Sequence, residues 1–358
     1  SSALFIGTGI RMGYGSNHSN FRRHVMTTTR KAVLTKRPDG EPVEADFSIE
    51  EAELPELQAG EVLLKVEHLS IDAFIRTTLD GPEGLHGTMD VGKPVMALGI
   101  GRVVDSRSDD LNQGDAVFGP MGAQTNVIWN ASMLRKVEET EVPARTYLGA
   151  LGMTTGLTAY AGMLVCGKIE EGDTVVVSAA AGAVGSIACQ LAKIAGARVI
   201  GIAGGPDKCK FLTDVIGCDE AADYKAGDLN ARLKTLAPDG INVFFDNVGG
   251  DVLDAALDNI AKGARVVICG AISQYNDMEN VTGPRLYLRI PERNASMIGF
   301  TVDQYAEQFP KMEEDISRWI KEGKINLPEH VIEGVDNFPN AIVTLMSGGH
   351  MGKLLVAP

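Results

Sequence analysis

Residues 180–185, Ala-Ala-Gly-Ala-Val-Gly, have the composition of a turn that binds phosphate groups. They follow a run of three valines and precede a stretch with helical spacing at 186–195. Gly182 would let the backbone approach a pyrophosphate, Gly185 would let helix and strand pack closely, and the start of the helix would offer unpaired N–H groups to the anion. Because Ala180 stands where the GxGxxG fingerprint has its first glycine, the six residues alone fit an ordinary strand–helix turn equally well. The flanking strand and helix favour binding of a dinucleotide.

The end of the next strand, at residues 198–203, indicates which dinucleotide is bound. A protein that binds NAD usually has Asp or Glu there, about 20 residues after the glycines, to hold the ribose hydroxyls. Here a Gly-Gly-Pro turn follows, and then Asp207 and Lys208. We expect the turn to carry Asp207 past the strand end, so that nothing repels a 2′-phosphate and Lys208 is available to attract one. A solvated surface lysine is the alternative for Lys208, but the sequence favours NADPH.

Strand-like and helical segments alternate from about residue 172, the pattern of a parallel, doubly wound sheet. The strand-like runs lie at 174–177, 198–203, 243–246, 264–269 and 295–300. Before residue 153 the chain instead has short β-rich runs separated by Pro and Gly, which predicts a partly open β-barrel. The predicted fold class is therefore α/β, with a Rossmann-type doubly wound parallel sheet and a partly open β-barrel domain.

These patterns predict four segments. Residues 1–25 contain three Arg, no acid and no periodicity, so they are read as an extension, either genuine or added for expression, with Met26 as a natural start. Residues 26–155 form the first segment of the catalytic barrel domain, and 156–302 form the nucleotide-binding domain. Residues 303–358, with a helical stretch at 313–322, form a second segment that returns to the barrel.

Composition excludes several classes of partner. The 358 residues include 33 Lys and Arg against 47 Asp and Glu, a net charge of −14, which argues against nucleic acid. The uncharged run at 174–192 contains two glycines and Gln190 and reads as strand, turn and helix rather than a membrane span, so no membrane partner is expected.

Cysteine and histidine usage predicts a cytoplasmic protein without a metal. The five cysteines are an odd number and form no CxxC pair, as in a reduced protein without a zinc knuckle. The six histidines show no HxxxH or Cys/His spacing and are His18, His24, His68, His86, His330 and His350. We therefore predict no catalytic metal.

With these motifs in hand, the chain resembles the zinc-independent branch of the medium-chain dehydrogenase/reductase superfamily. Within it, the sequence is similar to the leukotriene B4 dehydrogenase/prostaglandin reductase, 2-alkenal double-bond reductase and curcumin reductase family. The similarity runs from Thr29 to the C-terminus, and its most specific string is Cys-Gly-Ala-Ile-Ser-Gln-Tyr-Asn at 269–276. The other motifs are at 152–160, 180–185, 245–250 and 299–300.

The resemblance implies a GroES-like barrel beside a Rossmann domain, NADPH in the cleft, and hydride transfer to the β-carbon of an α,β-unsaturated aldehyde or ketone. It also implies a homodimer formed through the Rossmann halves. Carried over by motif, the pyrophosphate would be held by Gly182, Ala183, Val184 and Gly185, and the 2′-phosphate by Lys208 and Tyr224. The residues expected to line the cofactor and substrate face are Asn247, Cys269, Gly270, Ala271, Ile272, Ser273, Tyr275, Phe300, Thr301 and Val302.

The sequence departs from the family at three places. Phe74 stands where the family often has a tyrosine facing the substrate. His350 replaces the usual asparagine near the cofactor. The turn at residues 153–156 has one residue more than usual, which would reshape the wall of the pocket.

Tyr275 is the candidate for catalysis. Hydride attack at the β-carbon moves electrons onto the carbonyl oxygen, and a donor aimed at that oxygen would stabilise the enolate. A phenol with a pKa near about 10 is protonated at neutral pH and can donate. The alternative is a turn tyrosine that caps the loop at 276–277, and water is the expected proton source for the α-carbon. Two alternative functions remain: an NADPH quinone oxidoreductase and a non-catalytic dinucleotide-binding protein.

Overall fold

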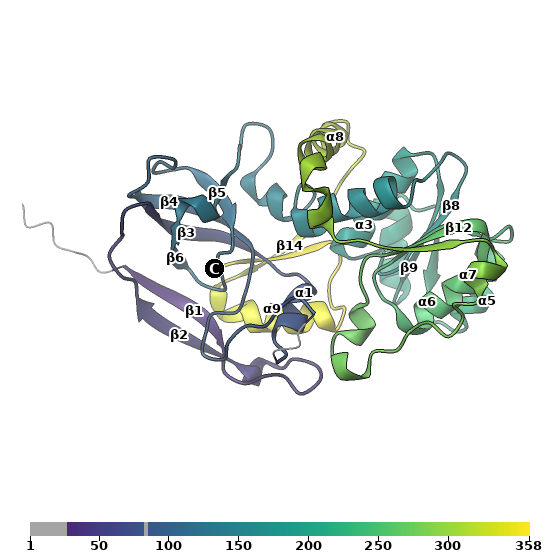
Figure 1. The fold of residues 1–358 in the computed structure, drawn as a ribbon, viewed down its shortest axis with the longest axis horizontal. Coiled ribbons are helices and arrows are strands. Elements are labelled where there is room, and N and C mark those ends of the chain that lie inside the picture. Colours follow the sequence, from purple (N-terminus) through teal and green to yellow (C-terminus); the bar gives the residue numbers. More distant parts are fainter. Residues whose placement is uncertain (1–26, 82–84) are drawn as a thin grey trace, which may run out of the picture.

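The computed structural model describes residues 27–81 and 85–358. The predicted extension at residues 1–25 lies outside this range. Figure 1 shows two bodies joined at the middle of the molecule, one built mainly from the first third of the chain and one from the middle. The last strands of the chain cross from the second body back to the first.

The second body contains a six-stranded sheet whose strands pair in parallel, in the order β10-β9-β8-β11-β12-β13. The strands are β8 (Thr174–Val177), β9 (Arg198–Ala203), β10 (Glu220–Asp223), β11 (Ile241–Asp246), β12 (Ile260–Ile268) and β13 (Ser296–Gly299). Counted along the chain, this is the order 3-2-1-4-5-6 of the Rossmann fold. The predicted doubly wound sheet is confirmed, although β10 was not among the predicted strands.

Helices cover both faces of this sheet. They are α3 (Ala183–Ile194), α4 (Pro206–Phe211), α5 (Leu229–Leu236), α6 (Gly250–Leu257) and α7 (Arg289–Glu292). Alternate residues of β8 belong to different cores: Val175 and Val177 pack in the cluster that contains α3, whereas Val176 packs in the cluster that contains α5 and α6. Burial on both faces explains why the strand sequence is continuously apolar.

The strands of the first body pair mainly in antiparallel fashion. Strands β1 (Thr28–Leu34) and β2 (Phe47–Glu53) form a two-stranded sheet. A second sheet has the order β14-β15-β3-β4-β5-β7, with β6 also paired to β3. Its strands from this part of the chain are β3 (Glu61–Ser70), β4 (Gly99–Ser106), β5 (Ala116–Gly119), β6 (Asn126–Asn130) and β7 (Arg135–Lys136). The short helix α1 (Phe74–Thr78) follows β3.

The C-terminal residues complete that sheet. They form α8 (Phe309–Lys321), β14 (Glu329–Glu333), α9 (Phe338–Met346) and β15 (Lys353–Ala357). Strand β15 pairs antiparallel with β3, and β14 pairs parallel with β15. Helix α8 begins four residues before the predicted stretch because Pro310 sits in its first turn, where a proline costs no hydrogen bond.

The residues interpreted as a lengthened turn at 153–156 are instead helical. They begin the π-helix η4 (Met153–Leu157), which continues through α2 (Thr158–Tyr160) into the π-helix η5 (Ala161–Cys166). The Leu157 N–H donates to the Gly152 carbonyl five residues earlier, at 3.0 Å. A π-helical turn accommodates one extra residue within a helix, so the addition widens this helix rather than the turn before it. Among the described residues, no helix is long and apolar enough to cross a membrane.

Candidate functional site

The predicted phosphate-binding turn lies between β8 and α3. Gly182 is the N-cap of α3, and the first turn of that helix carries no acidic side chain. A Cβ at Gly185 would lie 2.3 Å from the Ala179 carbonyl oxygen, so only glycine lets this helix start so close to the strand. A Cβ at Gly201 on β9 would lie 3.0 Å from the Cβ of Ala180. Gly201 therefore makes room for the alanine that replaces the first glycine of the fingerprint.

The segment before β15 crosses this turn. The Gly352 N–H donates to the Ala181 carbonyl at 2.8 Å, and Gly352 forms an isolated bridge with Gly182. Gly352 has a φ of +72°, and a Cβ there would lie 2.1 Å from the Pro328 carbonyl oxygen, so this position requires glycine. The C-terminal segment thus brings His350 to the nucleotide-binding turn.

Two lysines flank the end of β9. The Lys208 ammonium donates to the Gly348 carbonyl at 2.6 Å, and Lys225 lies 5.8 Å from the centre of the Tyr224 ring. Burial and the charge of Lys225 lower the pKa of Lys208. The nearby Asp223 carboxylate accepts hydrogen bonds from the backbone N–H groups of Gly205 and Lys225.

None of the ion pairs among the described residues joins Lys208 or Lys225 to a carboxylate. Two like charges held near each other, neither of them in an ion pair, favour an anionic ligand. Tyr224 is 46% exposed beside them. A Cβ at Gly204 would lie 2.9 Å from its hydroxyl, so the glycine at the strand end lets the ring approach.

The turns after β11 and β12 lie at the same edge of the sheet. Asp246 is buried, and its Oδ1 accepts from the Ser178 hydroxyl and from the Val248 and Gly249 N–H groups. Burial raises the pKa of Asp246. The Asn247 side-chain amide donates to the Ser178 carbonyl at 2.8 Å, so part of its hydrogen-bonding capacity already holds the turn.

Cys269 opens the second of these turns. Burial raises the pKa of its thiol to about 12, so the sulfur stays protonated and is no nucleophile at neutral pH. The segment that follows is held to the first turn, because the Ile272 N–H donates to the Asn247 carbonyl at 3.0 Å. The Ser273 hydroxyl donates to the Val248 carbonyl at 2.6 Å.

Tyr275 is 8% exposed, and its hydroxyl reaches back over its own loop. The hydroxyl oxygen accepts from the Ala271 N–H at 3.3 Å and would lie 2.9 Å from a Cβ at Gly270. Burial raises the pKa of Tyr275, so the phenol keeps its proton. Among the described hydrogen bonds, this O–H donates to no acceptor.

Phe74 begins α1, in the other body. Its ring meets the His86 ring edge-to-face at a centroid distance of 6.0 Å. The His86 Nδ1 lies 2.7 Å from the Thr77 hydroxyl, which donates to the Phe74 carbonyl at 2.8 Å. Burial lowers the pKa of His86. No motif pointed to this histidine.

Sequence reasoning also missed a buried ion pair. Lys353 Nζ lies 2.8 Å from Asp72 Oδ1, and both side chains are buried. Thr154 donates to the same oxygen at 3.1 Å, and Ser70 donates to the other oxygen at 2.5 Å. The sequence feature that could have revealed this pair is the presence of a lysine and an aspartate beside the apolar runs of β15 and β3. The pair joins the segment between β3 and α1 to the C-terminal strand, and Thr154 adds η4 to it.

The remaining predicted residues lie after β13 and before β15. Phe300 directly follows β13, and its ring is 6.5 Å from that of Tyr305; Thr301 is the N-cap of the 3-10 helix η9 (Val302–Gln308), which Val302 begins. His350 Nδ1 and Thr155 Oγ1 are buried atoms without a hydrogen-bond partner. Burial and the charges of Lys208 and Lys353 lower the pKa of His350 to about 4. Such orphaned polar atoms cost free energy unless a ligand completes them.

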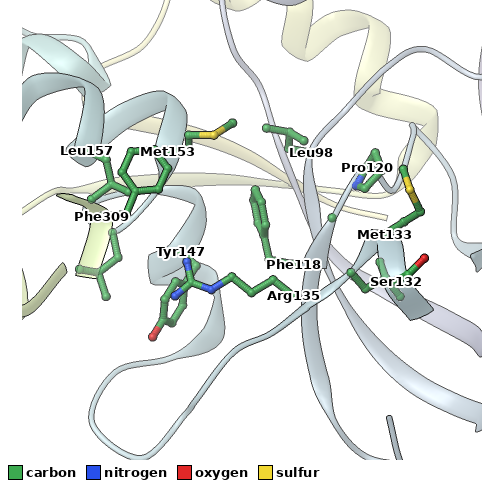
Figure 2. A pocket seen from close by; sticks show the side chains of 13 residues that line it. Leu98, Phe118, Pro120, Ser132, Met133, Arg135, Tyr147, Met153, Leu157 and Phe309 are labelled. Carbon is green, nitrogen blue, oxygen red and sulfur yellow. The ribbon is translucent and has the colours of Figure 1, made fainter. Parts of the chain in front are cut away.

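An apolar pocket of about 380 Å³ lies between the barrel and α8. Figure 2 shows Phe118, Tyr147, Met153 and Phe309 around it, with Arg135 across its opening. None of the predicted site residues lines it. Met153 and Leu157 of η4 do, whereas Thr154 between them bonds Asp72, so the pocket adjoins the buried ion pair through η4.

Within residues 27–81 and 85–358, no three His, Cys, Asp or Glu side chains come together as a metal site requires. The five cysteines are all free. The absence of a catalytic metal stays a prediction.

Comparison with known proteins now identifies the family. Residues 30–137 match the family described as the N-terminal domain of oxidoreductase, and residues 183–318 match the family described as zinc-binding dehydrogenase. Prostaglandin reductase 1 of Bos taurus is 38% identical over 338 residues, covering 92% of this chain and 99% of the relative. The NADPH-dependent curcumin reductase of Escherichia coli is 35% identical over 332 residues, covering 91% and 96%.

A solved structure supports the same family. The crystal structure of CurA from Vibrio vulnificus in complex with NADPH is 34% identical, covers 92% of this chain and 98% of that chain, and superposes with a TM-score of 0.86. The chain therefore belongs to the zinc-independent medium-chain dehydrogenase/reductase family that includes the prostaglandin, 2-alkenal and curcumin reductases.

Proposed function

We propose that this protein reduces the C=C bond of α,β-unsaturated aldehydes and ketones with NADPH. The observation that supports the cofactor most directly is the pair of lysines beside the phosphate-binding turn, Lys208 and Lys225, neither of which forms an ion pair. The family supports the reaction, because its named members reduce an alkenal or curcumin with NADP(H).

The residues present fit this cofactor. The turn of Gly182 and the start of α3 would take the pyrophosphate, and Lys208 with Tyr224 the 2′-phosphate. The orphaned atoms of His350 and Thr155 would find partners among the polar groups of the bound nucleotide. NADPH supplies the hydride when bound. The chain's own contribution is to bind and orient the reactants and to exclude water from the cleft.

Tyr275 is proposed to donate to the substrate oxygen as negative charge develops there. Its hydroxyl accepts one backbone hydrogen bond and keeps a proton to donate. That Ala271 N–H bond also orients the phenol, so the donor would need little reorganisation during the reaction. Phe74 is proposed to face the substrate from α1 with its apolar ring.

The experiment is to follow NADPH absorbance with a panel of enals, enones and quinones, and to identify the products. Consumption of NADPH with formation of the saturated aldehyde or ketone supports the proposal. Turnover with quinones alone would replace it with a quinone oxidoreductase. Binding of NADPH without oxidation across the whole panel would identify a non-catalytic dinucleotide-binding protein.

We also propose a homodimer formed through β13. This strand is the last of its sheet, and its residues Ser296, Met297 and Gly299 are exposed. An exposed strand edge can pair with the same edge of a second copy. Light scattering should give twice the chain mass, and Met297→Glu should shift the population towards monomer. A wild-type protein that is monomeric at all concentrations would contradict the dimer.

The free cysteines support a reducing compartment, and we propose the cytoplasm. Turnover should survive dialysis against a strong chelator, since the mechanism uses no metal. Loss of turnover that zinc restores would overturn this part of the proposal.

A further inference from the structure

Arg76 is a buried cation that connects the two bodies of the molecule. It lies in α1, and only 2% of its side chain is exposed. Its Nε donates to Asn276 Oδ1 at 3.1 Å, and its Nη2 reaches the Asn276 carbonyl at 3.4 Å. The remaining bonds go to the Gly40 carbonyl at 2.8 Å and to Asp80 Oδ1 at 2.7 Å. One guanidinium thus holds three segments that are distant in sequence.

The acceptor set explains why this residue is an arginine. Asp80 supplies a single compensating charge, and the other acceptors are two carbonyls and a side-chain amide. A guanidinium presents its donors in one plane and in fixed directions, so it satisfies acceptors on several sides at once. A lysine ammonium carries the same charge but not this geometry.

Asn276 directly follows Tyr275. The first half of this loop is fixed to the Rossmann domain, because the Ile272 and Ser273 N–H groups donate to carbonyls of the preceding turn at 3.0 and 3.2 Å. The second half is held at Asn276 by Arg76, from the other domain. Tyr275 lies between these two attachments.

The same helix carries the proposed substrate-facing residue. Phe74 begins α1, and Arg76 is two residues further along it. Figure 1 shows α1 at the junction of the two bodies, where it faces the loop that follows β12. A contact from Arg76 to Asn276 therefore fixes the position of Tyr275 relative to Phe74, although these side chains are on different domains.

We infer that Arg76 is a positioning residue for the reaction: it holds the loop of Tyr275 against α1 so that the phenol stays aimed at the substrate oxygen. This inference rests on the proposed function for the role of Tyr275. The hydrogen bonds to Asn276 themselves do not depend on it.

The first test is a double-mutant cycle. Asn276→Ala removes one acceptor and leaves Arg76 its bonds to Asp80 and Gly40, so the fold should be retained. We expect kcat to fall about tenfold, with the KM for NADPH changed by less than about twofold. In a Tyr275→Phe background the same substitution should lower kcat by less than about twofold, because there is no hydroxyl left to position. Equal effects in both backgrounds would overturn the inference.

A matched control lies in the same loop. The Asn280 amide donates to Asp277 rather than to Arg76, so Asn280→Ala should leave kcat within about twofold of wild type. Arg76→Lys keeps the charge and should lower kcat at least as much as Asn276→Ala. A wild-type kcat in Arg76→Lys would also overturn the inference.

The second test does not require turnover. Hydrogen exchange of the amides in residues 270–277 should be faster in Asn276→Ala and unchanged in Asn280→Ala. Unchanged exchange in Asn276→Ala would show that Arg76 does not hold the loop. If the wild type reduces no enone, the proposed function fails, and the exchange experiment still decides whether the tether exists.

Discussion

Two polar regions meet at the junction of the domains and differ in how far their groups are satisfied. At the ion pair of Asp72 and Lys353, both carboxylate oxygens have partners, with Thr154 and Ser70 completing the set. At the nucleotide end, Lys208 and Lys225 lack a carboxylate partner, and His350 Nδ1 has none of any kind. Both regions lie beside the cleft and contain a lysine.

How completely the polar groups are paired indicates which region has a structural role and which one binds a ligand. A buried charge that is fully paired has no capacity left for a ligand, and removing its partner exposes the cost of its burial. A set of cations and polar atoms left incomplete is stable only because something else completes it or because water reaches it. We therefore assign the first region to holding the C-terminal strand and η4 against the segment after β3, and the second to the cofactor. Each prediction below tests one side of this comparison.

The largest effect is expected at the buried pair. Lys353→Ala leaves Asp72 buried without its cation and should lower the free energy of unfolding by about 3–5 kcal/mol. Lys193→Ala is the control, because Lys193 and Asp219 form an ion pair that is 37% exposed on both sides and should contribute less than about 1 kcal/mol. Urea denaturation measures both. A loss at Lys353 no larger than at Lys193 would show that the buried pair contributes no more to stability than an exposed one.

Tyr275→Phe removes a donor and keeps the ring. We expect kcat to fall by about 10²–10³, the usual cost of one oxyanion donor, with little change in NADPH binding. Steady-state kinetics with a simple enone and equilibrium titration of NADPH separate the two quantities. Unchanged turnover would remove Tyr275 from the mechanism and leave it as a packing residue of its loop.

His350 should make stability depend on pH. The pKa of His350 is lowered to about 4 in the folded chain, below its unfolded value of 6.5, so below pH 6.5 the unfolded chain binds a proton that the folded chain does not. The free energy of unfolding should therefore fall by about 2–3 kcal/mol more between about pH 7 and about pH 4.5 than it does in His350→Asn. Parallel pH profiles for the two proteins would contradict this.

Much of the fold and part of the site could be predicted from sequence. The alternation of strands and helices gave the Rossmann sheet, because burial on both faces leaves continuous apolar runs such as Val175–Val177. Strand β10 was missed because its sequence, Glu-Ala-Ala-Asp, has low strand propensity and pairs on one side only. The helical start at Met153 was read as a turn because glycines and threonines are common in turns.

The pairs that join segments distant in sequence could not be predicted. Lys353 and Asp72 are 281 residues apart, and Arg76 and Asn276 are 200 apart, so no local spacing relates them. Motifs report residues that approach a ligand from one turn, whereas these pairs form only when segments far apart in the sequence come together in the fold. His86 was also missed, because no motif relates this histidine to the Phe74 ring that it contacts.

The most direct test of the comparison is the choice between NADPH and NADH at Lys208. Charge-assisted hydrogen bonds contribute about 1.5–3 kcal/mol, so Lys208→Ala should weaken NADPH binding roughly tenfold to hundredfold. NADH, which has no 2′-phosphate, should bind the variant and the wild type equally well. Equilibrium titration of both proteins with both nucleotides measures this. Equal weakening of NADPH and NADH would contradict the assignment of these unpaired lysines to the 2′-phosphate.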